Sequence, residues 1–188
     1  MNKKLNRKQN KRTKQPEIRI ARSVITLILG VVFLSGAAVF ASKGKDTILS
    51  FLRPDVKISL SGSVSRDDVK ISVDKAGTVK TGEVINWTIC SKNAGEAKAS
   101  GFKTVGQIPP GTEYVAGSAK GDEAPDVEFS IDGGKSFSKK PTVTEKQADG
   151  SEKQVAAPVS MYTQVRFGWE KPLDSDHELN AFYSVRVK

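Results

Sequence analysis

Residues 23–42 form one uninterrupted apolar stretch, SVITLILGVVFLSGAAVFAS, with no charged side chain. About 20 helical residues, at a rise of 1.5 Å each, span the hydrocarbon core of a bilayer. The stretch has no polar face, so it does not suit a helix that packs on the surface of a globular core. The sequence therefore predicts one N-terminal hydrophobic helix, either a transmembrane segment or a signal segment.

The positive charge of the chain is concentrated before this stretch. Residues 1–22 carry nine Lys and Arg side chains and one acid, Glu17, whereas the remainder carries 21 basic and 20 acidic side chains. Such a tail is predicted to be disordered and cytoplasmic, and its charge suits anionic lipid headgroups. The near-neutral remainder offers no basic surface, so we expect no nucleic-acid partner.

Two fates of the hydrophobic segment remain open. As an uncleaved anchor, it leaves the basic tail inside and the C-terminal part outside the cytoplasmic membrane. As a signal peptide, it places Val39 and Ala41 before a cut ahead of Ser42. The long basic leader favours the anchor, and the small residues near Ser42 favour cleavage. Both fates deliver the rest of the chain to the outside.

From residue 69 onward the hydrophobic pattern has a period of two, which is typical of half-buried strands. Turn signals rich in Gly, Pro and Asn separate the alternating stretches, and no convincing helical period follows residue 55. This pattern predicts an all-β fold, a single antiparallel β-sandwich over residues 69–188, with Trp87 and Trp169 in its core. The alternating stretches are 69–73, 84–91, 126–131, 161–169 and 179–187.

Two segments differ from this pattern. Residues 43–68 are predicted to be a connector or stalk, in which Asp55–Leu60 alternates and indicates an additional edge strand. Residues 138–158 are polar and are expected to form a long exposed loop or a ragged hairpin.

Three stretches resemble a known bacterial module. They are Val79–Ile89 (VKTGEVINWTI) with Asn93-Ala94-Gly95 after it, Ile108–Ala119 (IPPGTEYVAGSA), and the C-terminal part from Val165 to Val187. Together they resemble the DUF11-type repeat of bacterial surface proteins. The resemblance implies an Ig-like β-sandwich, here in a single copy, and a role at the cell envelope.

No residue pattern indicates an enzyme, a catalytic residue or a cofactor site. His177 is the only histidine, and no G-x-S-x-G nucleophile motif accompanies it. Cys90 is the only cysteine, so it closes no intrachain disulfide, and it lies on the polar face of its strand. Gly77 and Gly82 have the spacing of a phosphate loop, but Glu83 follows where that loop needs Lys, so turn residues are the simpler interpretation.

One weak metal candidate stands before the last strand. Asp174, Asp176 and Glu178 alternate there, and carboxylate oxygens are calcium ligands. A solvated acidic turn explains the same residues without a metal.

The sequence predicts a bacterial cell-envelope protein with a structural or adhesive role and a protein partner, bound through loops or by strand addition at Asp55–Leu60. One alternative is a cleaved, secreted module of a surface layer or fibre. Another is a carbohydrate- or calcium-dependent binding module. The carbohydrate reading requires a row of exposed aromatic rings, for which Tyr162, Trp169 and Phe182 are the candidates.

Overall fold

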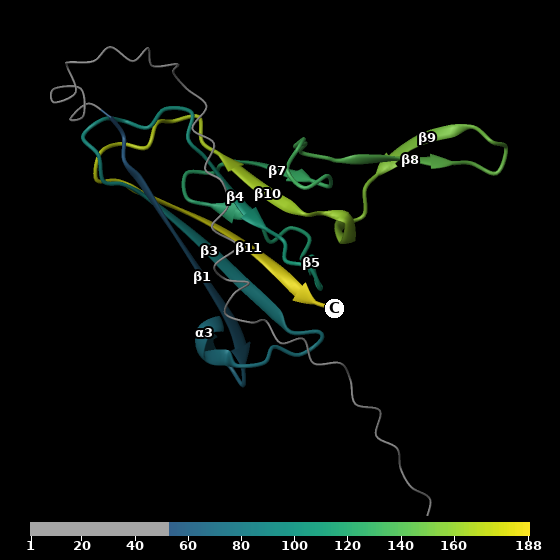
Figure 1. The fold of residues 1–188 in the computed structure, drawn as a ribbon, viewed down its shortest axis with the longest axis horizontal. Coiled ribbons are helices and arrows are strands. Elements are labelled where there is room, and N and C mark those ends of the chain that lie inside the picture. The colour runs from purple at the N-terminus through teal and green to yellow at the C-terminus, as the bar shows by residue number, and fades with distance from the viewer. Residues whose placement is uncertain (1–52) are drawn as a thin grey trace, which may run out of the picture.

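The computed structural model describes residues 53–188, which fold into antiparallel β-sheets (Figure 1). The basic tail 1–22, the hydrophobic segment 23–42 and residues 43–52 lie outside this described part. Among residues 53–188, no helix is both long enough and apolar enough to cross a membrane. The all-β prediction is confirmed for the described residues.

The larger sheet, sheet 1, has the strand order β2-β1-β3-β11-β5, and the short β6 also pairs with β11. All of its pairings are antiparallel. A one-turn helix, α3 (Val73–Ala76), follows β2. The strands of sheet 1 are β1 (Val56–Arg66), β2 (Val69–Ser72), β3 (Val84–Asn93), β5 (Thr112–Tyr114), β6 (Lys120–Gly121) and β11 (Glu178–Val187).

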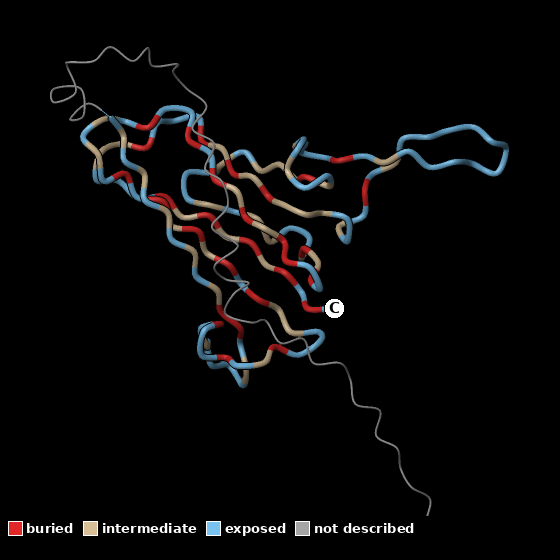
Figure 2. The backbone as a smooth tube through the Cα atoms, viewed as in Figure 1, coloured by how far each residue is buried: buried red, intermediate tan, exposed pale blue. Residues whose placement is uncertain are grey.

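The smaller sheet, sheet 2, has the order β4-β10-β7, and its strands are β4 (Lys103–Gln107), β7 (Asp126–Ser130) and β10 (Gln164–Gly168). A separate hairpin of β8 (Thr142–Lys146) and β9 (Glu152–Ala156) projects from the body and is almost entirely exposed (Figures 1 and 2). This hairpin lies within the polar stretch 138–158. A 3-10 turn, η2 (Val159–Met161), connects it to β10.

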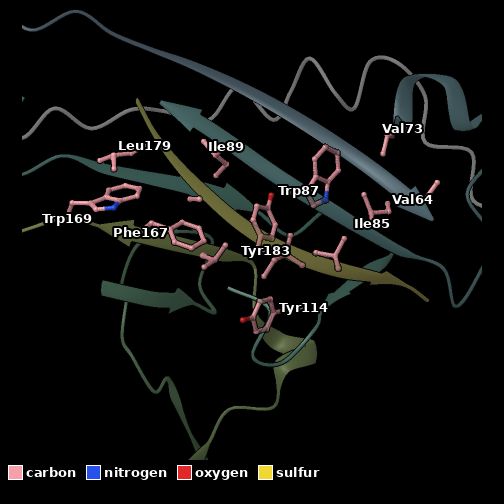
Figure 3. Packing of buried hydrophobic residues seen from close by; sticks show 14 of the residues in the cluster. Val64, Val73, Ile85, Trp87, Ile89, Tyr114, Phe167, Trp169, Leu179 and Tyr183 are labelled. Carbon is pink, nitrogen blue, oxygen red and sulfur yellow. The ribbon is translucent and has the colours of Figure 1, made fainter. Parts of the chain in front are cut away.

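The core lies between the two sheets, as expected for a β-sandwich. On β3 and β11, alternate residues are buried, whereas the residues between them face outward. Figure 3 shows Trp87, Phe167, Trp169 and Tyr183 gathered in this layer. Trp87 is 4% exposed and Trp169 is 5% exposed, so the prediction that both lie in the core is confirmed.

The two sheets are in contact where Tyr183 of β11 lies over Gly106 of β4. A Cβ atom at Gly106 would lie only 2.7 Å from Tyr183 Cζ, so only glycine leaves room for the ring. The Tyr183 hydroxyl donates a hydrogen bond of 2.8 Å to the Gln107 carbonyl oxygen. Burial raises the pKa of this hydroxyl, so the group stays protonated and can donate the hydrogen bond.

The structure differs from the sequence pattern in three places. In residues 43–68, the predicted connector, the expected edge strand at Asp55–Leu60 is present as β1, but it continues to Arg66 and pairs with β3 along Val56–Val64 as an integral part of sheet 1. Met161, predicted on the apolar face of a strand, is 42% exposed in the η2 turn. The strands β4 and β5 carry no clear alternation and were not predicted.

Replacing Gly106 with Ala should destabilise the domain by about 1–3 kcal/mol, because the added methyl group meets the Tyr183 ring. Gly168→Ala is the matched control in the same sheet. Its added Cβ would meet nothing closer than Lys103 Cγ at 3.6 Å, so its stability should be unchanged or slightly higher. Chemical denaturation of both variants measures the difference. Equal stability of the two would show that the sheets separate easily at this point.

Candidate interaction surface

The first half of β1 has one unpaired edge. β1 pairs with β3 along Val56–Val64 but with β2 only at Ser63–Arg66, so in the described part of the chain residues 56–62 have no neighbour on their second side. The Ala94 N–H donates to the Asp55 carbonyl oxygen, which identifies 55 and 94 as a hydrogen-bonded pair. Because such pairs alternate along an antiparallel ladder, the main-chain groups of residues 56, 58, 60 and 62 point to the open edge.

The side chains of this edge also alternate. Val56, Ile58 and Leu60 lie on the core side of the sheet but are only half-buried. Lys57, Ser59 and Ser61 are exposed on the opposite face. An added strand would therefore find main-chain hydrogen bonds together with an apolar side and a polar side, as in recognition by strand addition. The edge includes most of Asp55–Leu60, the segment that the sequence predicted for this role.

The start of β1 is held by the buried amide of Asn93. Asn93 Oδ1 accepts hydrogen bonds from the Asp55 and Gly95 N–H groups, both at 3.1 Å. Its Nδ2 donates to the carbonyl oxygens of Ala97 at 2.7 Å and Leu173 at 3.1 Å. The amide thus ties β1 to the chain that leads into sheet 2. Its sequence context, Asn-Ala-Gly, indicated a turn but did not indicate these four hydrogen bonds.

The other end of β1 is held by Arg66. Its guanidinium donates two hydrogen bonds to the Glu83 carboxylate, at 2.7 and 2.9 Å, and one each to the Ala76 and Thr78 carbonyl oxygens at 2.8 Å. The hydrogen bond from Arg66 holds the pKa of Glu83 below its usual value. Sequence reasoning missed this group, because no local pattern brings Arg66 and Glu83, 17 residues apart, together.

The three calcium candidates do not converge. Asp174 is 2.8 Å from Lys98 Nζ, and this lysine holds the pKa of Asp174 below its usual value. Asp176 lies 4.0 Å from Lys92 Nζ, and Glu178 accepts a hydrogen bond from Asn180. Among residues 53–188, no three His, Cys, Asp or Glu side chains gather as a metal site. The solvated acidic turn is the better interpretation of these residues.

His177 and Cys90 each have other neighbours in the described structure. The His177 main chain accepts a hydrogen bond from the Asn93 N–H, which fixes the loop before β11. Cys90 is half-buried on the outer face of β3, as predicted. Burial, assisted by Glu178, raises the pKa of its thiol, which disfavours the reactive thiolate.

The row of exposed aromatic rings required for carbohydrate binding does not form. Trp169 is buried and stacks on Phe102 at a centroid distance of 5.5 Å. Tyr162 is half-buried against Phe129 at 4.7 Å. Phe182 points to the outer face, as predicted, and stands there without the other two rings.

One depression, of about 320 Å³, lies at the end of the sandwich where β11 begins. Its lining includes Lys98, Lys171, Asp174 and His177, so its walls are largely polar and charged. Sites for small organic ligands are mostly apolar with few polar groups. The β1 edge is therefore better supported as a protein contact than this depression is as a ligand site.

In comparisons with protein-family models, curated proteins and solved structures, nothing matches this chain. The DUF11-type resemblance therefore stays an interpretation of the residues quoted above.

Replacing Asn93 with Ala should destabilise the domain by about 2–4 kcal/mol, because it leaves buried main-chain groups without partners. Asn86→Ala is the control on the same strand. Asn86 is exposed and accepts one hydrogen bond from Ser184, so its loss should cost less than about 0.5 kcal/mol. Thermal and chemical unfolding measure both. Similar losses for the two variants would contradict a special role for the Asn93 amide.

Proposed function

We propose that this chain is a bacterial cell-envelope protein with a structural or adhesive role. The basic tail and the hydrophobic segment 23–42 hold it at the cytoplasmic membrane, and the β-sandwich works outside as a single DUF11-like, Ig-like module. The support for this topology is the charge asymmetry around an uncharged stretch of membrane-spanning length.

The observation that carries the adhesive role is the open edge of β1. Natural sheets usually cover or shorten their edges, because an unpaired edge invites another strand. Here the outer side of residues 56–62 has no strand partner within the described domain, and both ends of β1 are fixed by hydrogen bonds, from Asn93 at one end and Arg66 at the other. A fixed, extended and unpaired edge supports binding of a protein partner by strand addition.

Cleavage ahead of Ser42 would give the second candidate, a released module of a surface layer or fibre. The same edge would serve it, since residues 56–62 stay in the mature chain. The binding module for carbohydrate or calcium has less support, because its aromatic rings and carboxylates have other contacts.

Fractionation with alkaline carbonate and an intact mass determine the topology. We expect a full-length species of 20.3 kDa that stays in the washed membrane, since a spanning helix is not extracted by this treatment. A soluble species that begins near Ser42 would replace the anchor with the secreted module. A full-length protein in the cytosol would overturn both.

A photoreactive side chain at Ser61 should crosslink a protein partner in intact cells, because Ser61 lies on the open edge. Thr88 is the matched control, since it pairs directly with Ser61 but lies on the inner strand β3. Ile58→Pro should abolish the Ser61 crosslink, because it removes a main-chain donor that faces the edge. Equal crosslinking from both positions would indicate binding to the sheet face. No crosslink from Ser61 would exclude this edge.

A further inference from the structure

The open edge of β1 has a definite length, because it is bounded at both ends. β2 pairs with β1 from Ser63 onward and covers the edge there. At the other end, Pro54 has no N–H group to offer to an added strand. The open stretch is therefore residues 56–62, and its midpoint is Ser59. Within it, the main-chain groups of the even-numbered residues point to the open side.

This stretch is complementary to itself in hydrogen bonding. A second copy that lies beside it in the antiparallel direction, centred on Ser59, brings even-numbered residues opposite even-numbered residues. Ile58 then faces Leu60 of the second copy, and Val56 faces Gly62 of the second copy. In an antiparallel ladder, two residues in a hydrogen-bonded pair exchange both of their main-chain bonds. The outward-pointing N–H and C=O groups of the stretch thus find partners in a copy of the same stretch.

The apolar side chains match in the same register. A two-fold axis through Ser59, perpendicular to the sheet, keeps the core side of both strands on the same side. The half-buried side chains of Val56, Ile58 and Leu60 then lie beside the same three side chains of the second copy. Directly facing apolar side chains stabilise an antiparallel pair. The two edges therefore form one apolar band across the joint.

The charges on the opposite face favour this register over its neighbours. Lys57 is exposed and is the one charged residue within the stretch 56–62. An axis through Lys57 would place two lysines directly opposite each other, and an axis through Ile58 would make them diagonal neighbours. The axis through Ser59 places Lys57 opposite Ser61 of the second copy. The two lysines are then four residues apart, about 14 Å along the strands.

The other end of sheet 1 offers a poorer partner for this edge. It is formed by β5, which has three residues, and β6, which has two. A head-to-tail contact between β1 and that end would pair at most three consecutive residues and would leave the rest of the stretch uncovered. Pairing of β1 with β1 uses the whole stretch on each copy and closes after two copies. The lengths of the described edges thus favour a closed pair over a fibre.

We propose that the strand partner of the β1 edge is a second copy of this chain, bound in the antiparallel direction about a two-fold axis at Ser59. The two copies of sheet 1 join into one continuous sheet, with β1 beside β1. This inference rests on the proposed function, in which the β1 edge binds a protein strand, and adds the identity and register of that strand. Natural sheets usually cover such an edge, and here the second copy is the cover.

Disulfide formation in the full-length protein tests the register, with Cys90→Ser removing the native thiol. Ser59→Cys should link two copies under a mild oxidant, because facing residues of a non-hydrogen-bonded pair have Cα atoms about 4.5 Å apart, within disulfide range. Ser61→Cys is the matched control on the same exposed face. Its two thiols would lie about 14 Å apart along the strands, so its yield should be at least about fivefold lower. Equal yields, or no dimer from Ser59→Cys, would overturn the proposal.

Charge substitution at the same two positions gives an independent readout. Ser61→Glu should tighten the dimer about threefold or more, because each new carboxylate faces Lys57 of the second copy. Ser59→Glu should weaken it at least about fivefold, since two carboxylates face each other at the axis. Both positions are exposed on one strand, so dissociation constants from a dilution series of the full-length protein are directly comparable. Effects of the same sign would overturn the two-fold register.

The photocrosslink from Ser61 distinguishes failure of this proposal from failure of the proposed function. A product of twice the 20.3 kDa chain mass identifies a second copy as the partner. A product with a different protein shows that the edge binds another strand, which overturns this proposal and leaves the proposed function standing. No product from Ser61 overturns both.

Discussion

The Asn93 side chain is fully buried, and its amide uses all four of its hydrogen-bonding positions on main-chain groups. These groups belong to the start of β1, the crossing from β3 to sheet 2, and the segment before β11. A buried amide is stable only when it is fully paired, so its partners fix one another's positions. The place where the chain reaches β1, and with it the geometry of the β1 edge, depends on this one side chain.

Apolar packing alone would not give β1 this position. In its first half, Val56, Ile58 and Leu60 are half-buried at the margin of the core. The strand is held by its nine-residue pairing with β3 and by polar clamps at both ends, Asn93 at one and Arg66 at the other. Such a strand can stay extended while its outer edge remains available for binding.

Local alternation predicted the strands that form the two faces of the core. β7 and β10 lie within predicted stretches, β3 and β11 extend beyond theirs by two residues and one residue, and Trp87 is buried as expected. β4 escaped prediction because its two buried positions are Thr104 and Gly106, and at Gly106 the Tyr183 ring supplies the apolar contact from the other sheet. That requirement concerns two residues 77 positions apart, and no local pattern contains it. For the segment of the β8–β9 hairpin the sequence left a long loop and a ragged hairpin open, because both faces of the hairpin are polar.

The candidate surface could be predicted only in part. Alternation in Asp55–Leu60 indicated a strand, and its position outside the main pattern suggested an edge. Its true surroundings depend on the relative widths of the two sheets, which follow from pairings distant in sequence. The side chains suggested for calcium or carbohydrate binding do not come together, for a related reason. Alternation placed Asp174 and Asp176 on one side, but Lys98 and Lys92, from other segments, compensate their charges.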